Sequence, residues 1–246
     1  MNILVTGARG FIGSHLIKHL KYQTNHNLFE FNRNDDINDL INIIPKLDFV
    51  YHLAGVNRSN DKNLFQKVNV DLTHKLCKVL SVNKNIKLLY ASSIQASNNN
   101  HYGISKRKAE IICQDFEKEY SNKVYICRLP GIFGEGCKPN YNSVVATFCY
   151  NIANNLEIKI VDKNKKIELI YINNLCNYFL SFLNNYDPDK TKNILPTYKI
   201  KVSDLASTIR KFNINLDNDF DESNISQFKT NLFKTFKSYK ESNFEV

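Results

Sequence analysis

No apolar run in this sequence of 246 residues approaches the roughly 18 residues that a membrane-spanning helix needs. The first residues, Met1–Val5, lead directly into a strand pattern and lack the basic start and cleavage site of a signal peptide. The six cysteines are scattered and include no Cys-x-x-Cys pair, which is typical of free thiols in a reducing compartment. We therefore expect a cytoplasmic protein that does not bind a membrane.

The sequence also has few features that would bind a metal or a nucleic acid. His15 and His19 lie one helical turn apart, but no carboxylate stands between them and no third ligand is apparent. The net charge is +9, yet Lys and Arg are spread through a Lys- and Asn-rich chain and do not form a stripe with aromatic residues. The charge reflects either biased composition or a surface suited to anionic ligands such as a nucleotide sugar. We expect no metal and no nucleic-acid partner.

Strand and helix patterns alternate from the first residue. Apolar residues make up 43% and charged residues 23%, as in ordinary soluble globular proteins. The expected strands are Ile3–Val5, Leu28–Phe31, Asp48–Leu53, Lys87–Ala91 and Val124–Leu129. The expected helices between them are Phe11–Leu20, Leu64–Leu80 and Tyr102–Tyr120. This alternation predicts an α/β fold with a Rossmann-type, doubly wound parallel sheet.

The regular alternation weakens after Pro130. Gly131–Tyr141 is typical of a loop over the site, and a strand pair is expected near Ile158–Val161 and Ile167–Tyr171. Further helices are expected at Val144–Asn154, Leu175–Leu183 and Ser203–Phe212, whereas residues from Asn213 onward are polar with weak helical periodicity. We expect a cofactor-binding core at residues 1–135, with parts of 155–180. Residues 136–246 would form mainly a small substrate-binding lobe and C-terminal helices.

A glycine-rich turn joins the first expected strand to the first helix. Gly7 allows a tight turn, Gly10 lets the backbone approach a pyrophosphate, and Gly13 lets the helix pack closely on the strand. Phe11 and Ile12 lie at the helix N-terminus, where free amides and a positive dipole favour phosphates. This context predicts a dinucleotide site.

The end of the second strand bears on the choice between two cofactors. An NAD site carries an acid there for the ribose 2′-hydroxyl, whereas this chain has Asn32 and then Arg33. A guanidinium suits a 2′-phosphate, which favours NADP(H) over NAD(H). Glu30 is the competing observation, because strand alternation can also place it near the ribose.

Ser93, Tyr102 and Lys106 are the candidate catalytic residues. Tyr102 and Lys106 are four residues apart, so they share one face of a helix. A free phenol titrates near ~10, and a neighbouring ammonium favours its phenolate. Ser93 ends the preceding strand and can hydrogen-bond the oxygen whose proton moves. A second Tyr-x-x-x-Lys pattern, Tyr186 with Lys190, has no such serine.

Together these motifs resemble the extended short-chain dehydrogenase/reductases of the NAD-dependent epimerase/dehydratase family, from residue 1 to about 175. The resemblance implies that Tyr102 is the general acid/base, that Lys106 holds the nicotinamide ribose and lowers the pKa of Tyr102, and that Ser93 orients the substrate oxygen. It implies that Asn69 and Val70 buttress the catalytic helix. It also implies further cofactor contacts at Asp36, Ile37, Leu53, Ala54, Gly55 and Leu129.

A longer stretch narrows the resemblance. The Lys-Pro-Asn-Tyr-Asn-Ser run at residues 138–143 is similar to NADPH-dependent reductases of this family that act in capsular polysaccharide synthesis. The similarity implies that Ser93, Gln95, Lys138 and Asn142 contact a UDP-sugar. It also implies a homodimer. Such reductases carry a C-terminal cupin domain that performs an epimerisation, and this sequence ends at Val246 without one, so we expect a separate cupin-type epimerase as a candidate partner.

Three positions depart from the family pattern. Gly131 stands where the family usually has an asparagine, and Asn173 and Asn174 stand where it favours carboxylates. These departures bear on how the substrate is held, whereas the three catalytic positions are intact.

The motifs also discriminate among reactions. Dehydratases of this superfamily carry an acid next to the catalytic serine or threonine, where this chain has Ile94 and Gln95. We therefore expect NADPH-dependent reduction of a UDP-4-keto-6-deoxy-N-acetylhexosamine, in the route to UDP-N-acetyl-L-fucosamine. One alternative is a nucleotide-sugar 4-epimerase with tightly bound NAD. The other is a catalytically weakened, partner-dependent remnant that keeps the fold and the cofactor site.

Overall fold

The computed structural model describes residues 1–23, 25–184, 195–215 and 226–241. The chain divides into two compact units, Met1–Leu129 and Pro130–Val246. Residues 130–135 and 155–180 cluster with the second unit, whereas we expected the former and parts of the latter in the core. The second Tyr-x-x-x-Lys pattern, at Tyr186 and Lys190, lies outside the described residues.

The first unit contains a five-stranded parallel sheet with the order β2-β1-β3-β4-β5. Its strands are β1 (Asn2–Thr6), β2 (Asn27–Phe31), β3 (Phe49–His52), β4 (Lys87–Ser93) and β5 (Lys123–Leu129). The residues of β3 are all buried, and only Lys87 of β4 is partly exposed, as expected when helices cover both faces of a parallel sheet. The predicted Rossmann-type sheet is confirmed.

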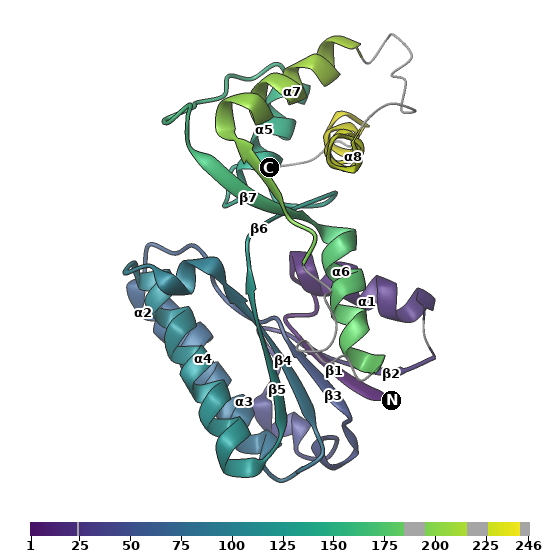
Figure 1. The fold of residues 1–246 in the computed structure, drawn as a ribbon. Coiled ribbons are helices and arrows are strands. Elements are labelled where there is room, and N and C mark those ends of the chain that lie inside the picture. The colour runs from purple at the N-terminus through teal and green to yellow at the C-terminus, as the bar shows by residue number, and fades with distance from the viewer. Residues whose placement is uncertain (24, 185–194, 216–225, 242–246) are drawn as a thin grey trace. The chain divides into compact units, whose positions relative to one another are not determined.

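Helix α1 (Phe11–Gln23) covers one face of this sheet, and α3 (Leu72–Leu80) and α4 (His101–Tyr120) cover the other (Figure 1). The single helix expected at residues 64–80 consists of three consecutive segments, namely α2 (Lys62–Phe65), the π-helical η3 (Gln66–Asp71) and α3. The short 3₁₀ helices of this unit are η1 (Ile37–Leu40), η2 (Ile44–Lys46) and η4 (Ile94–Ser97). The core between the sheet, α3 and α4 includes Leu76, Leu80, Leu88, Tyr90 and Phe116.

The second unit contains a three-stranded sheet, in which β7 (Lys166–Tyr171) pairs in parallel with β6 (Gly131–Phe133) and antiparallel with β8 (Tyr198–Lys201). Two expectations were therefore wrong. Gly131–Phe133 is a strand and not part of a loop, and the residues near Ile158–Val161 form no strand. The antiparallel partner of β7 comes from later in the chain, since Ile200 of β8 lies opposite Ile167.

The helices of the second unit are α5 (Val144–Ala153), α6 (Ile172–Ser181), η5 (Phe182–Asn184), α7 (Val202–Asn215) and α8 (Gln227–Glu241). Helix α8 lies in the segment after Asn213, where we noted weak helical periodicity within a region expected to hold C-terminal helices. It buries Leu232, Phe236 and Tyr239 against α5 and α7, at the spacing of one helix face. Packing of this narrow apolar face stabilises a segment whose remaining residues are mostly polar.

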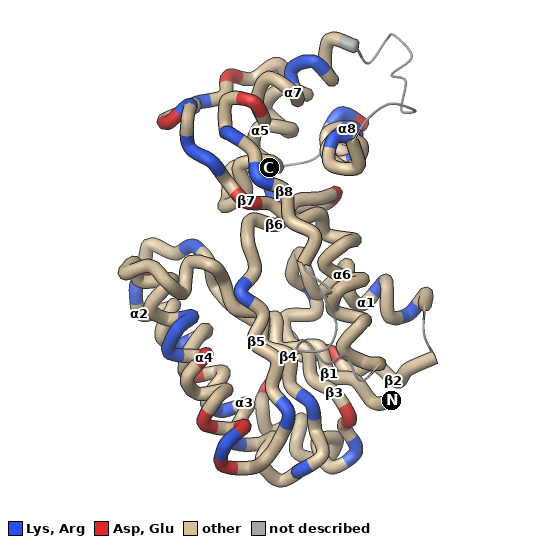
Figure 2. Tube along the Cα trace, viewed as in Figure 1, with Lys and Arg blue, Asp and Glu red and all other residues tan. Residues whose placement is uncertain are grey.

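Basic residues lie in both units (Figure 2), and the cysteines form no disulfide. Lys and Arg are distributed over both units (Figure 2). All six cysteines are buried free thiols. Among the described residues, no helix is long and apolar enough to cross a membrane, and no three His, Cys, Asp or Glu side chains group as metal ligands.

Candidate active site

The glycine turn after β1 has room for glycine alone at two positions. Gly7 has a φ of +69°, and a Cβ there would lie 2.8 Å from the backbone nitrogen of Ala54. A Cβ on Gly13 would lie 2.2 Å from the carbonyl oxygen of Gly7. At Gly10 the corresponding distance to the Gly7 oxygen is 3.1 Å, which is tight but less severe. The turn therefore keeps a side-chain-free backbone at the N-terminus of α1, as a pyrophosphate site requires.

Asn32 fastens this turn to the end of β2. Its Oδ1 accepts a hydrogen bond of 2.9 Å from the Arg9 backbone N–H. Arg33 follows with an exposed side chain. Asp36 accepts from the Asn38 N–H at 2.9 Å and thereby caps η1, so it has a structural role whether or not it contacts adenine. Glu30 forms an ion pair of 3.6 Å with Lys21 of α1.

A chain of buried hydrogen bonds runs from β1 through β3 to α3. The Nδ1 of His52 lies 2.7 Å from the Thr6 Oγ1, and its Nε2 lies 2.9 Å from the Thr73 Oγ1. Thr73 donates its single hydroxyl proton to the Asn69 carbonyl at 2.7 Å. The Thr73 oxygen therefore accepts from Nε2–H, and Nδ1 accepts from Thr6. Burial, with a smaller contribution from Lys106, lowers the pKa of His52 to about 3, so its ring is neutral.

The same chain continues to the helix that carries Tyr102. The Asn69 amide donates to the Ser105 Oγ at 2.9 Å and to the Val56 carbonyl at 2.9 Å, and accepts from the Val56 N–H at 2.8 Å. Ser105 in turn donates to the Tyr102 carbonyl at 2.7 Å. We call the residues Thr6, His52, Thr73, Asn69 and Ser105 the buried network. It connects the strand before the glycine turn with the first turn of α4.

Tyr102 lies beside Ser93 because α4 begins very close to η4. The Asn100 side chain caps the helix by accepting from the Gly103 N–H at 2.7 Å. A Cβ on Gly103 would lie 2.1 Å from the Gln95 carbonyl oxygen, so only glycine permits this approach. The Tyr102 and Ser93 side chains are hydrogen-bonded to each other. The predicted Ser–Tyr pair is thus brought together.

The electrostatics of Tyr102 differ from our expectation that Lys106 lowers its pKa. Burial raises the pKa of Tyr102, and the hydrogen bond with Ser93 only partly opposes this. The Lys106 ammonium instead donates to the Ala91 carbonyl at 2.6 Å and lies 4.3 Å from the centre of the Tyr90 ring. In this arrangement Tyr102 is a protonated phenol near neutral pH and can donate a proton to a substrate oxygen.

Lys106 is itself strongly perturbed. Burial lowers its pKa to about 7, against smaller opposing effects of Cys113 and Glu110. A Cβ built on Gly55 would lie 3.8 Å from the Lys106 Nζ, so the backbone after β3 passes close to the ammonium. Leu53 and Ala54 precede this point and are partly buried. The expected cofactor segment after β3 therefore lies beside the expected catalytic lysine.

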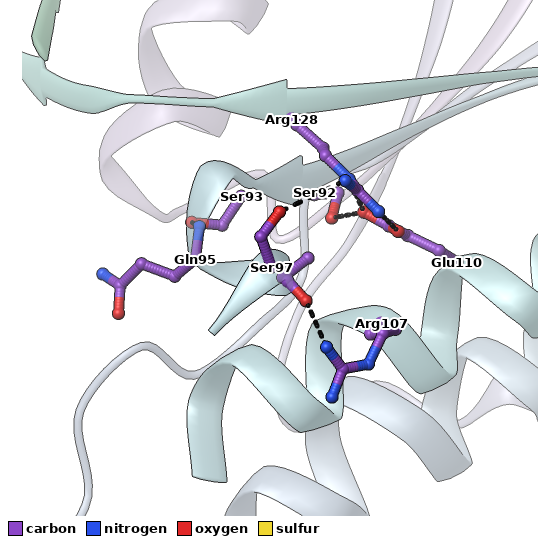
Figure 3. Close-up of polar contacts among 8 residues, drawn as sticks. Ser92, Ser93, Gln95, Ser97, Arg107, Glu110 and Arg128 are labelled. Carbon is purple, nitrogen blue, oxygen red and sulfur yellow. Dashed lines mark hydrogen bonds and ion pairs between the residues drawn. The ribbon is translucent and has the colours of Figure 1, made fainter. Parts of the chain in front are cut away.

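The remaining predicted contacts are positioned as follows. Gln95 is exposed, and its side chain points away from the pair formed by Glu110 and Arg128 (Figure 3). Leu129 is buried at the end of β5, opposite Ser93. Lys138 and Asn142 belong to the second unit, where both are exposed. Their contact with a substrate stays a prediction.

Two of the three unusual positions of the second unit, Gly131 and Asn173, have local physical reasons. A Cβ on Gly131 would lie 3.0 Å from Leu169 Cδ2, so a larger residue there would require β7 side chains to shift. Tyr171 donates its one hydroxyl proton to Glu135, at 2.8 and 2.9 Å from the two carboxylate oxygens. Only a donor at position 173 can then bond the phenol oxygen, and the Asn173 amide does so at 3.4 Å.

Sequence reasoning missed one part of the site. Glu110, Arg128 and Ser92 form a cluster beside Ser93, and none of them was singled out as functional. The available signal was spacing, because Glu110 lies four residues after Lys106 on the same helix face. Thr6 and Thr73 had no comparable signal, since their role depends on a histidine from another strand.

The fold and this site define a dinucleotide-binding α/β protein with a Ser–Tyr–Lys set. The sequence matches the NAD dependent epimerase/dehydratase family over residues 3–196. The chain belongs to this family.

Two relatives narrow the similarity. The chain is 39% identical over 214 residues to the UDP-2-acetamido-2,6-beta-L-arabino-hexul-4-ose reductase of Pseudomonas aeruginosa. The aligned residues make up 86% of this chain and 58% of that protein. It also resembles the crystal structure of the capsular polysaccharide assembling protein CapF from Staphylococcus aureus, with a TM-score of 0.82 and 32% identity, over 100% of this chain and 67% of that chain. The chain thus spans little more than half the length of the reductase.

A third comparison concerns the fold alone. The UDP-glucuronic acid 4-epimerase from Bacillus cereus, in complex with NAD, superposes with a TM-score of 0.82 at 17% identity, over 98% of this chain and 97% of that chain. At this identity the likeness extends to the arrangement of the elements and not to the reaction.

Proposed function

We propose that this chain is an NADPH-dependent reductase of a UDP-4-keto-6-deoxy-N-acetylhexosamine, acting in capsule or O-antigen sugar-nucleotide synthesis. The observation that carries the proposal is the hydrogen-bonded Ser93–Tyr102 pair, with Tyr102 protonated near neutral pH and Lys106 one turn along the helix. The similarity to the Pseudomonas aeruginosa reductase supports the choice of reaction and of sugar. The route that we propose leads to UDP-N-acetyl-L-fucosamine.

The first unit fits a dinucleotide. Gly7, Gly10 and Gly13, with the N-terminal amides at Phe11 and Ile12, would hold the pyrophosphate. We assign the adenosine end to Arg33, Asp36 and Ile37, and the nicotinamide end to Leu53, Ala54, Gly55, Tyr102, Lys106 and Leu129. When bound, the reduced cofactor supplies a hydride to the carbonyl carbon. The exposed Arg33 guanidinium and the pairing of Glu30 with Lys21 support NADP(H) over NAD(H).

The side chains of the protein then transfer one proton to the substrate. Ser93 donates a hydrogen bond to the C4 oxygen of the sugar, and Tyr102 gives its phenolic proton to that oxygen as the alkoxide develops. The products are the C4 alcohol and a tyrosinate. Lys106 stabilises the tyrosinate by its positive charge, and solvent returns the proton to Tyr102.

The substrate contacts extend this assignment to the second unit. We assign Ser93 and Gln95 to the sugar, and Lys138 and Asn142 to the diphosphate or sugar of the UDP moiety. The exposure of Lys138 and Asn142 supports their availability to an anionic ligand. A cytoplasmic homodimer and a separate cupin-type epimerase that supplies the substrate are also part of the proposal.

The deciding experiment follows cofactor oxidation at 340 nm with a panel of UDP-4-keto-6-deoxy sugars, with NADPH and NADH compared in parallel. We expect turnover with NADPH and one N-acetylated 4-keto sugar. Bound cofactor that no sugar consumes would favour the remnant. Interconversion of C4 epimers of a UDP-sugar that carries a C4 hydroxyl, assayed separately without added cofactor, would favour the 4-epimerase. Preference for NADH would overturn the assignment of Arg33.

A further inference from the structure

Glu110 is a buried carboxylate on the helix of Tyr102 and Lys106. Its side chain is 6% exposed, and it lies one turn after Lys106. Arg128 forms a bidentate ion pair with the Glu110 carboxylate, with Nε 2.9 Å from Oε1 and Nη2 2.6 Å from Oε2 (Figure 3). The Ser92 hydroxyl donates to the same Oε1. Three donors thus satisfy one carboxylate.

This cluster joins three elements at the point where Ser93 leaves the sheet. Ser92 stands directly opposite Arg128 in the β4–β5 register, and Glu110 reaches both strands from α4. Figure 3 shows Arg128 and Glu110 directed at each other across this edge. An ion pair with a buried carboxylate is weak evidence for stability, since apolar packing often stabilises such a place at least as well. Stability alone therefore does not explain the pair of Glu110 and Arg128, and a functional role would.

The groups around the Lys106 ammonium indicate what this role is. The titratable groups that interact with its ammonium are His52 on β3, Tyr90 on β4, and Cys113 and Glu110 on α4. The first three are uncharged near neutral pH. Burial keeps His52 deprotonated and raises the pKa of Tyr90, and a hydrogen bond with Cys77 together with burial raises the pKa of Cys113.

Glu110 is the member of this set that carries negative charge. Burial alone would raise its pKa, but the hydrogen bonds from Arg128 and Ser92 outweigh burial and lower it. Arg128 is about half exposed, so solvent screens its charge more than that of Glu110. The field at Lys106 from this pair is therefore net negative.

We propose that Glu110 is a positioning residue for the reaction proposed above, on which this inference rests. Held by Arg128 and Ser92, it fastens the catalytic helix to β4 and β5 and keeps the Lys106 ammonium charged on the Tyr102 face of the helix. The consequence is that two substitutions at one ion pair should affect Lys106 in opposite directions.

The test measures the pKa of Lys106 by NMR, with lysine labelled with ¹³C at Cε and the signal assigned with Lys106→Arg. No substrate or cofactor is added. Glu110→Gln should lower the Lys106 pKa by about one unit, because an opposite charge nearby is lost. Arg128→Gln should raise it, because the carboxylate stays and its counter-charge is removed. Ser92→Ala keeps both charges and should change it little.

Asp115→Asn is the matched control, since it likewise converts an acid of α4 to its amide, but at an exposed position. An unmoved Lys106 pKa in a folded Glu110→Gln variant overturns the inference, as does a shift of the same sign in both ion-pair variants. If Glu110→Gln fails to fold, the sign of the Arg128→Gln shift decides. Where activity is present, the pH profile of kcat/KM should move with the measured pKa. Absence of turnover in the unmodified chain would overturn the proposed function and leave this NMR result standing.

Discussion

Around Tyr102 and Lys106, the polar side chains of the first unit are buried and bonded to one another, whereas in the second unit Lys138, Tyr141 and Asn142 lie at the surface. In the first unit, each donor in the buried network has one acceptor that fits it, so a change at one residue alters the geometry of the next. Surface side chains are exchanged at little cost in stability. The departures from the family pattern, at Gly131, Asn173 and Asn174, fall in the second unit, where Asn173 and Asn174 are partly buried.

The comparison suggests a division of labour. The proposed proton transfer and cofactor binding need atoms held within a fraction of an ångström, and the buried side chains of the first unit would be held in this way. Recognition of a sugar nucleotide can be adjusted by surface contacts. We therefore expect substitutions in the first unit to reduce kcat or cofactor affinity, and substitutions at 138 and 142 to raise KM.

The largest expected effect comes from Tyr102→Phe. Loss of the phenolic proton should reduce kcat by about a thousandfold, within the range for general acid catalysis, while the affinity for NADPH stays within about twofold, since the ring remains. Stopped-flow rates and fluorescence titration of NADPH measure the two quantities. Tyr22→Phe, at a fully solvated tyrosine, is the control and should behave as the unmodified chain. Near-normal turnover in Tyr102→Phe would remove Tyr102 from the reaction.

The glycine turn should respond next most strongly. Gly13→Ala places a methyl 2.2 Å from the Gly7 carbonyl oxygen, so the turn must move. We expect a loss of about 3 kcal/mol in the free energy of unfolding, as for a strongly overpacked site, and at least tenfold weaker NADPH binding. Gly10→Ala meets the same oxygen at 3.1 Å and should cost clearly less. Urea denaturation and NADPH titration test this order, and the reverse order would contradict the role given to Gly13.

The substrate contacts of the second unit should give a smaller, different response. Lys138→Ala removes a charged donor from the proposed diphosphate contact, which is worth about 1.5 to 3 kcal/mol. We expect KM for the UDP-sugar to rise by about tenfold or more with kcat nearly unchanged. Lys166→Ala, an exposed lysine of β7, is the matched control. A fall in kcat at constant KM would show that the two units do not divide the work in this way.

The last effect concerns the pH dependence of stability. The pKa of His52 is about 3 in the fold and near 6.5 in an unfolded chain, so below pH 6.5 the unfolded state takes up a proton that the folded state does not. Stability from this group is complete above pH 6.5 and is lost as the pH falls toward 3, by at most about 1.4 kcal/mol per pH unit. Urea denaturation of His52→Gln between pH 7 and 5 should show a shallower loss. Parallel curves would indicate that His52 does not titrate on unfolding.

Much of the first unit was predictable because its signals are local. Each expected strand of the parallel sheet lies at the observed place, since short apolar runs alternate there with amphipathic helices. The glycine turn and the Ser93–Tyr102–Lys106 spacing were equally readable. Helix α8 was not, because its segment is mostly polar and becomes helical by packing Leu232, Phe236 and Tyr239 against α5 and α7.

The sequence by itself determined the parallel sheet, the glycine turn and the spacing of Ser93, Tyr102 and Lys106, because periodicity and short spacings encode these features within one element and its neighbours. Only the tertiary structure decided the partners of β7 and the ion pair between Arg128 and Glu110. It also decided that His52 is neutral and that Tyr102 is protonated. These depend on burial and on contacts between residues distant in the chain. Desolvation and long-range hydrogen bonding are properties of a packed interior, and no local pattern records them.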